Sequence, residues 1–395
     1  MRLIGRNDLA GRGHCGEGIA LLAARNRKYL YVAHERGPVN FSVLDVTDPA
    51  RPDLLTQTLL PHDGVRSNSL ALGDDLLIVA YQVREPGQRP AGIEVFDLSE
   101  DPAEPKPVGQ LDLSGPRSRG THWVGYTGGR YAYLSTGTPD SRPTHKDDDQ
   151  FPVIVDLSRP DRPREAGRWW LPGTQEGDDC PPPVRHERFD SGFRAHNVHV
   201  DPRRPDRAYV GYLDGGVVIL DIADVSAPRG VSRLDYHPPM PGFTHTVLPL
   251  LSRDLLAISD ESVVDHAADY PKLVWFADAS HEEAPLIISS APMPPVADYA
   301  ARGGRFGAHN LHENPPLEWA WRDEEIVFGS FFNAGVRAFD IRDPFRPREA
   351  AAFVPPAPPG RDAIQINDVY VAADGIVYAV DRGGGGLYVL RYEGV

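Results

Sequence analysis

Seven stretches of this chain align at one position, and four of them carry histidine there. The residues at this position are Glu17, Asn68, His122, His196, His245, His309 and Asn367, each at or near the start of a short apolar run such as THWVGY or THTVLPL. Imidazole is a ligand for iron, copper, zinc and nickel, and neutral nitrogen ligands leave a divalent ion its full charge for activating oxygen or water. If these runs meet at one place, the four histidines predict a metal site.

A second repeat indicates which elements must bring these runs together. An apolar run closed by an acidic residue and a Pro-containing turn recurs as FSVLDVTDPARP, IEVFDLSEDPAEP, PVIVDLSRPDRP, VVILDIADVSAP, LVWFADASHEEAP and VRAFDIRDPFRP. A seventh copy, LYVLRYEGV, stops with the chain, whereas the N-terminal RLIGRNDLAG resembles KPVGQLDLSG, which begins at Lys106. A ring whose last repeat is completed by its own N-terminal strand accounts for both ends.

Each repeat is expected to form four strands, because short β-branched and aromatic runs alternate with Gly, Asp, Asn and Pro. Helical periodicity is absent over any useful length. Four-stranded units repeated seven times predict an all-β fold, a seven-bladed β-propeller closed by the N-terminal strand. One domain over residues 1–395 is expected, since each blade stacks on the next. The acidic residues that end the third strands are expected to bond turn backbone: Asp45, Asp97, Asp156, Asp221 and Asp340.

The repeat resembles that of the LVIVD-repeat proteins over nearly the whole chain. Those proteins are β-propellers, so the resemblance implies the same fold. More distantly the chain resembles the selenium-binding protein family, which includes methanethiol oxidases and shares the H-x-x-H spacing. The paired-cysteine segment of that family is not found in this sequence, so methanethiol oxidation is not transferred. In layout, the four histidines are also similar to the iron centre of carotenoid-cleaving oxygenases, which are seven-bladed propellers too.

Inner strands of a propeller begin around its axis, so the four histidines are predicted to hold one divalent transition metal, with iron(II) preferred and copper next. Glu17 and Asp368 are the candidate catalytic groups, which would handle protons or orient the imidazoles, and Glu313 is a third candidate carboxylate near the ligands. The alternative is a ring of axial histidines that bond to water and to neighbouring strands.

Other candidates for the pocket are Asn68, Asn367, His199, His312, Cys15 and Arg194. His199 and His312 close two H-N-x-H pairs, and residues three apart on a strand point to opposite faces, which favours packing between blades over metal binding. Cys15 is either a pocket thiol or ligand, or a buried core residue. Cys180 is expected in an exposed loop.

Three long loops are expected on the face where the inner strands begin, over Thr136 to Gln150, Pro172 to Ala195 and Ala291 to Ala308. Long loops in compact domains are often lids or binding loops. The arginine and aromatic residues in and around the last two suit an anionic or aromatic small substrate. Trp169 and Trp170 are expected to pack on an outer strand instead.

Charge and motifs exclude several function classes. The net charge of -15 argues against a nucleic-acid partner, and the chain has no apolar run long enough for a membrane span. The first residues lack the apolar segment of a signal peptide, so we expect a cytoplasmic protein. No motif of a serine hydrolase, P-loop enzyme, zinc protease or dinucleotide-binding enzyme is present. The oligomeric state stays open.

The favoured function is a metal-dependent oxidoreductase, an oxidase or oxygenase that uses dioxygen on a small organic molecule. The reason is that a four-imidazole set without a carboxylate ligand is unusual for a zinc hydrolase. Two alternatives stay open. One is a non-catalytic protein-interaction propeller, and the other is a non-redox metal-dependent hydrolase, lyase or isomerase.

Overall fold

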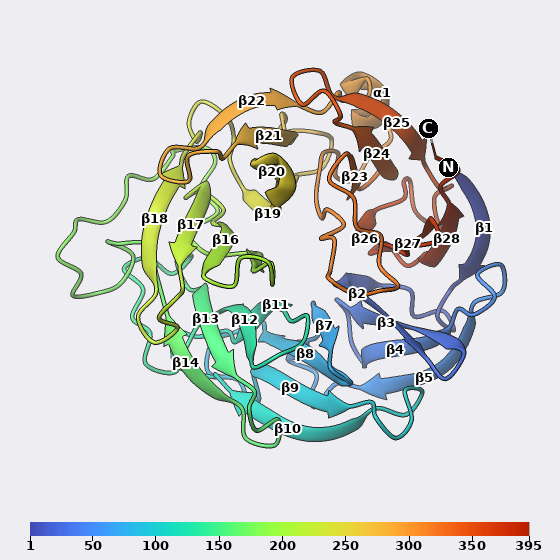
Figure 1. The fold of residues 1–395 in the computed structure, drawn as a ribbon, viewed down its shortest axis with the longest axis horizontal. Helices are drawn as coiled ribbons and strands as arrows, with labels where there is room; N and C mark the ends of the chain where they lie inside the picture. The colour runs from blue at the N-terminus through green and yellow to red at the C-terminus, as the bar shows by residue number, and fades with distance from the viewer. Residues whose placement is uncertain (395) are drawn as a thin grey trace.

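Seven antiparallel sheets stand around a common axis as the blades of a propeller (Figure 1). Residues of the innermost strands, such as Glu17, line cavities near this axis, and we call this region the channel. This computed structural model describes residues 1–394. The predicted all-β, seven-bladed architecture is confirmed.

The strands of the first three blades, from the channel outward, are β2 (Cys15–Ala24), β3 (Arg27–His34), β4 (Val39–Asp45) and β5 (Asp53–Leu59) in blade one; β6 (Val65–Arg66) with β7 (Leu70–Gly73), β8 (Leu76–Val83), β9 (Gly92–Asp97) and β10 (Lys106–Asp112) in blade two; and β11 (Thr121–Gly125), β12 (Tyr131–Thr136), β13 (Phe151–Asp156) and β14 (Arg164–Arg168) in blade three.

Those of the other four are β15 (Val198–His199), β16 (Arg207–Gly211), β17 (Val217–Asp221) and β18 (Arg229–Leu234) in blade four; β19 (Thr244–Leu250), β20 (Leu255–Asp260), β21 (Val274–Asp278) and β22 (Leu286–Ser290) in blade five; β23 (Ile326–Ser330), β24 (Val336–Asp340) and β25 (Arg348–Phe353) in blade six; and β26 (Ile366–Val371), β27 (Ile376–Asp381), β28 (Gly386–Arg391) and β1 (Arg2–Asn7) in blade seven.

The ring closes where the two ends of the chain meet. Strand β1 is antiparallel to β28, with Arg2 opposite Arg391 and Asn7 opposite Leu387, and Figure 1 shows the two termini side by side. A bulge interrupts β1 between Leu3 and Gly5. Strand β10, the outer strand of blade two, has a bulge at the equivalent place, between Pro107 and Gly109. The predicted closure by the N-terminal strand is therefore confirmed.

The recurring acidic residue and turn join each blade to the one before it. The carboxylates that end the third strands accept a hydrogen bond from the backbone N–H two residues later, as predicted, at Asp45, Asp97, Asp156, Asp221 and Asp340. In three places the turn that follows lies against a glycine in the outer strand of the preceding blade, at Gly5, Gly109 and Gly167. A Cβ on Gly109 would lie 2.0 Å from the carbonyl oxygen of Pro160, and one on Gly167 would lie 1.9 Å from that of Val225.

Blade six departs from the regular pattern at the channel. Its sheet has three regular strands, and the innermost place belongs to the segment 309–312. This segment pairs with β23 through a single bridge between Leu311 and Gly329, with hydrogen bonds from the N–H of His309 to the Ser330 carbonyl and from that of His312 to the Phe328 carbonyl. The segment 309–312 is therefore held by a few hydrogen bonds and not by continuous strand pairing.

In the part of the chain that the structure describes, helix is confined to α1 (Val296–Ala300), which lies in the third long loop, and a 3-10 turn, η1 (Leu251–Arg253). Within residues 1–394, no helix has the length and apolar character needed to cross a membrane. The buried apolar side chains form clusters that adjacent blades share, such as the one that joins Tyr31 of blade one to Tyr81 of blade two. The core therefore holds the ring together between its blades.

Candidate metal centre

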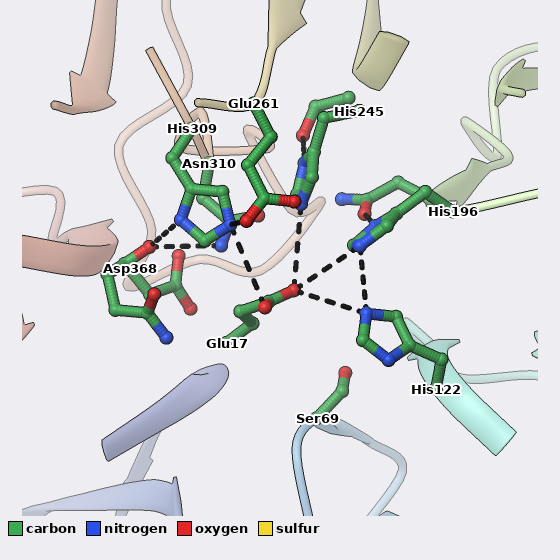
Figure 2. A network of polar contacts seen from close by, with 12 residues as sticks. Glu17, Ser69, His122, His196, His245, Glu261, His309, Asn310 and Asp368 are labelled. Carbon is green, nitrogen blue, oxygen red and sulfur yellow. Dashed lines mark hydrogen bonds and ion pairs between the residues drawn. The ribbon is translucent and has the colours of Figure 1, made fainter. Parts of the chain in front are cut away.

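Glu17 and the four histidines meet at one point of the channel (Figure 2). Glu17 Oε2 lies 3.7 Å from His122 Nε2, 3.6 Å from His196 Nε2 and 3.6 Å from His245 Nε2. Its other oxygen, Oε1, lies 3.7 Å from His309 Nε2. Each imidazole comes from the innermost segment of a different blade, so the common register of the blades brings the rings together.

The donor atoms are close enough for one ion. His122 Nε2 and His196 Nε2 are 2.8 Å apart, and the ligand atoms of Glu17, His196 and His245 all lie within 4.8 Å of one another. The same limit holds for a second group, made of His245, His309 and Glu261. Ligands bound at about 2.1 Å lie roughly 3 Å apart when adjacent and about 4.2 Å apart when opposite. The distances between the donor atoms of the cluster are of this size.

Hydrogen bonds on the far side of two rings decide which nitrogen faces the centre. His309 Nδ1 lies 2.6 Å from the carbonyl oxygen of Asn367, so it must donate. His196 Nδ1 lies 2.8 Å from Asn197 Oδ1, and the Asn197 amide orientation is set by its Nδ2, which donates to Glu313 Oε1 at 2.6 Å. Both Nδ1 atoms therefore carry the proton, and both Nε2 atoms direct a lone pair at the centre.

The other two rings are also anchored at Nδ1. His122 Nδ1 lies 3.0 Å from Gln82 Oε1 and 3.3 Å from Arg66 Nη2, and His245 Nδ1 lies 2.9 Å from the hydroxyl oxygen of Thr246. Partners of this kind orient metal-binding histidines in proteins. All four rings thus have Nδ1 anchored and Nε2 turned toward Glu17.

Several atoms at the centre lack a hydrogen-bond partner. Within the described part of the chain, this is true of Glu17 Oε2, His245 Nε2 and His309 Nε2, all of which are buried. A buried polar atom without a partner is costly, and a group of acceptors is satisfied together by a cation. The residues present therefore fit a divalent transition metal.

The protonation states agree with that fit. Burial, reinforced by the neighbouring imidazole, lowers the pKa of His122 well below its ordinary value and lowers that of His196 to about 3. Burial alone would raise the pKa of Glu17, but the imidazoles around it hold that pKa well below the ordinary range. Neutral imidazoles and an ionised carboxylate are the forms that bind metals.

Glu17 thus lies among the Nε2 atoms rather than on the outer side of the rings. A second carboxylate, Glu261, is also present, with Oε1 3.5 Å from His309 Nε2. The donor set therefore includes carboxylates, unlike the predicted four-imidazole set. Glu313 reaches His196 only through Asn197, and Asp368 forms no hydrogen bond to an imidazole in residues 1–394; its Oδ1 accepts from the Val369 N–H at 2.8 Å.

Asn68 and Asn367 support the cluster through their backbone. The carbonyl of Asn68 accepts a hydrogen bond from the Glu17 N–H at 2.6 Å, and the carbonyl of Asn367 accepts from His309. The glycines on both sides of Glu17 allow this approach, because a Cβ on Gly16 would lie 2.4 Å from the Asn68 oxygen. The sequence G-E-G is therefore what brings this strand to the channel.

The second histidines of the two H-N-x-H pairs lie away from the cluster, on the wall of a cavity beyond Glu17. His312 Nε2 donates to the carbonyl oxygen of Trp321 at 2.9 Å, and its Nδ1 accepts from the N–H of Val371 at 3.2 Å, which connects blades six and seven. Burial lowers the pKa of His199 and that of His312 to about 4, so both rings are neutral.

The two cysteines and Arg194 are also placed. Cys15 lies in an apolar cluster, its Sγ donates to the Gly13 carbonyl at 3.6 Å, and burial raises the pKa of its thiol well above the ordinary value. Cys180 is exposed. Arg194 lines a cavity next to the histidines, with Nη1 3.4 Å from Asp149 Oδ1.

Glu261 and Gln82 were not predicted, and they come from a second ring of positions. Aligning the second strands places Glu35, Gln82, Gly137, Leu213, Glu261, Phe332 and Arg382 in one column, directly after the apolar run. Most of these residues line the cavity next to the cluster, and Phe332 stacks on His309 with ring centroids 4.6 Å apart. An alignment of the second strands would have revealed these residues from the sequence.

Comparison with known proteins agrees with this architecture. Residues 206–235, which contain β16, β17 and β18, match the family model of the LVIVD repeat. We found no significant match among curated proteins.

Solved structures show the same fold at low identity. A hypothetical selenium-binding protein from Sulfolobus tokodaii is 14% identical, over 98% of this chain and 92% of that one, with a TM-score of 0.55. The periplasmic gluconolactonase of Pseudomonas aeruginosa is 12% identical, over 92% and 96%, with a TM-score of 0.59. The Cps50 (Swd1) β-propeller domain of Myceliophteria thermophila is 12% identical, over 95% and 98%, with a TM-score of 0.57. Such identities concern the fold alone, and together with the repeat match they identify the chain as a seven-bladed β-propeller that carries the LVIVD repeat.

Proposed function

We propose that this protein is a metal-dependent oxidoreductase, of the oxidase or oxygenase type, that acts on a small organic molecule at a mononuclear centre. One observation carries the proposal. Four imidazole Nε2 atoms and the carboxylates of Glu17 and Glu261 meet in the channel, and the outer nitrogen of every ring is already held by another group. The atoms that face the centre therefore suit a cation.

The donor set supports iron(II) first and copper second. Each of the two ligand groups combines two histidines with one glutamate, Glu17 in one and Glu261 in the other. Imidazole suits iron and copper, and a mixed set of histidines and carboxylate is found in non-haem iron oxygenases. When bound, the metal would supply the activation of dioxygen for reaction with the substrate.

The residues of the chain have separate tasks in this proposal. The four histidines hold the metal as neutral ligands, and Phe332 covers one face of His309 and shields it from water. Glu17 lines the cavities on both sides of the cluster, so its carboxylate can accept a proton on one side and release it on the other. Burial raises the pKa of Asp368 well above its ordinary value, so this acid can supply a proton from the second cavity.

A second candidate function is non-redox metal catalysis, such as hydrolysis. The presence of Glu17 among the histidines favours it, because two histidines and a glutamate also hold the zinc of several hydrolases. A hydrolase would work with zinc and without oxygen consumption. A non-catalytic interaction propeller, the third possibility, would bind no metal tightly.

Elemental analysis of protein purified without a histidine tag tests the proposal. We expect close to one iron or copper per chain, and at least a tenfold loss of metal in His245→Ala and His196→Ala. His312→Ala is the matched control, because His312 is equally buried but faces the second cavity, and it should keep its metal. Absence of metal from the wild-type protein, or equal loss in the control, would overturn the proposal.

An oxygen electrode separates the two catalytic candidates. The iron-loaded protein should consume oxygen with a substrate, and the zinc-loaded protein should not. A protein that is active with zinc alone would be a hydrolase, lyase or isomerase. A cytoplasmic location and the absence of nucleic-acid and membrane partners remain predictions, which fractionation of the source cells checks.

A further inference from the structure

A cavity of about 420 Å³ opens on the histidine cluster from the side where the inner strands begin. Glu17, His122, His196 and Glu261 form its inner end, and residues of two long loops, such as Asp147 and Arg194, form part of its wall. Ligand sites for small molecules have volumes of about 300–1,000 Å³. A molecule in this cavity would therefore lie against the atoms that face the metal site.

Arginines dominate the wall of this cavity. The five that line it are Arg66, Arg119, Arg194, Arg305 and Arg382. The cavity on the other side of Glu17 differs, because its wall is mainly apolar and aromatic and carries the acids Asp368 and Glu313. The two sides of the cluster are thus built for different ligands.

The five guanidinium groups share three carboxylates. Arg66 and Arg382 both contact Glu35, at 2.9 and 2.6 Å. Arg119 and Arg194 both contact Asp149, at 2.6 and 3.4 Å. Arg305 contacts Glu261 at 2.8 Å.

The five arginines therefore outnumber the carboxylates that they contact by two. The other acids of the wall contact other groups: Glu17 faces the histidines, Asp190 shares Arg185 with Asp148, and Asp147 pairs with Lys146 at 3.1 Å. Two carboxylates that are each shared by two guanidinium groups leave donors for a ligand with one negative charge.

Unused hydrogen-bond donors belong to the same wall. Among residues 1–394, Arg194 Nε, Arg382 Nη1 and Gln150 Nε2 are buried and have no acceptor. Buried donors of this kind usually have a partner, and a planar carboxylate is the anion that guanidinium groups bind with two parallel hydrogen bonds. Phe243 and Leu213 add apolar surface for the rest of such a molecule.

We propose that this arginine-lined cavity binds a small organic carboxylate, with its carboxylate on the arginines and its remaining atoms over the histidine cluster. Its role as the substrate rests on the proposed function, but its binding does not require the metal. The ligand class follows from the shared arginines, the unused donors and the cavity volume together.

Calorimetric titration of the purified protein tests this inference, with benzoate and glutarate as carboxylate probes and benzamide as the neutral analogue of benzoate. We expect at least one of the two carboxylates to bind. If benzoate binds, benzamide should bind at least tenfold more weakly. Arg194→Gln should weaken carboxylate binding by about ten- to a hundredfold, because a hydrogen bond to a charged group is lost. Arg194→Lys should recover part of that loss.

Arg168→Gln is the matched control, since the Arg168 side chain is 25% exposed and that of Arg194 is 21% exposed, but Arg168 lies on an outer strand. Equal effects of the two Gln variants, equal binding of benzamide and benzoate, or no binding of either carboxylate would overturn the inference. Tighter binding of inorganic phosphate than of both carboxylates would also overturn it. Titration of chelated protein separates the two proposals, because carboxylate binding without any metal site would leave this inference standing and remove the proposed function.

Discussion

His122 Nε2 and His196 Nε2 lie 2.8 Å apart, while the Nδ1 atom of each ring faces an amide oxygen, that of Gln82 or Asn197. Because Nδ1 of His196 must donate to Asn197, its Nε2 presents a lone pair to the other ring. Arg66 Nη2 lies 3.3 Å from Nδ1 of His122, so in the metal-free protein Nε2–H of His122 can donate to this lone pair. A cation bound by both nitrogens would replace that hydrogen bond, since adjacent ligands of one ion have about this separation.

Removal of the metal should lower the stability of the protein. A ligand present at about a thousand times its dissociation constant adds roughly 4 kcal/mol, which corresponds to a shift of several degrees in the unfolding midpoint. Scanning calorimetry of the purified, the chelated and the iron-restored protein measures this shift. His122→Ala should respond much less to the chelator, because it has lost one ligand already. Identical midpoints for all three wild-type samples would contradict the prediction.

Glu17→Gln should weaken both forms of the protein. In the metal-bound form the variant loses an anionic ligand, and we expect the metal affinity to fall at least tenfold in equilibrium dialysis. In the metal-free form the imidazoles hold the pKa of Glu17 well below its ordinary value, so the folded state favours the carboxylate, and the neutral amide should lower the free energy of unfolding at pH 7. Urea unfolding with and without chelator measures both changes. A metal affinity equal to that of the wild type would indicate a purely structural role for Glu17.

Asn197→Ala should weaken metal binding without removing a ligand. The Asn197 side chain holds Nδ1 of His196 at 2.8 Å, and loss of such a partner typically costs about ten- to a hundredfold in metal affinity. Asn310→Ala is the control, because Asn310 follows His309 in the same H-N-x-H pattern but its side chain donates to the Asn367 carbonyl instead. The control should change the affinity by less than about threefold. Equal losses in both variants would show that the effect is one of packing.

The blade architecture was predictable because every blade repeats the same local chemistry. An acidic residue that caps its own turn, as Asp45 does, is readable from the residue types alone. The register of the inner strands was predictable for the same reason, and it places the histidines of blades three to six at the channel. The irregular pairing of blade six was not predictable, because its inner segment is held by isolated hydrogen bonds that leave no strand pattern.

The composition of the cluster was predictable only in part. Glu261 and Gln82 follow second strands, and an alignment restricted to the inner strands does not contain them. The position of the Glu17 carboxylate depends on how closely its strand approaches Asn68, which is a distance between blades. Such tertiary distances are absent from the pattern of a single repeat.

Gly167→Ala should destabilise the fold through a contact between blades. Its Cβ would lie 1.9 Å from the carbonyl oxygen of Val225 in the turn of the next blade, and forced repacking of this kind costs about 1–3 kcal/mol. Gly230→Ala is the matched control on the next outer strand, because its Cβ would meet only Trp169, at 3.6 Å. Chemical unfolding of both variants measures the difference. Equal stabilities would mean that the turn moves freely, and would remove its proposed role in joining the blades.

Glu313 should make the stability of the metal-free protein depend on pH near neutrality. Burial raises the pKa of Glu313 from 4.5 to about 7, although its Oε1 accepts a hydrogen bond from Asn197. A raised pKa means that the folded state favours the protonated acid, so the stabilisation is complete below about pH 4.5 and is lost as the pH rises through 7. Glu313→Gln keeps the acceptor oxygen and cannot ionise. Relative to this variant, the wild type should lose up to about 3 kcal/mol between pH 5 and pH 8, measured by urea unfolding in the presence of chelator. Parallel pH curves for the two proteins would show that Glu313 is already ionised in the folded state at pH 5.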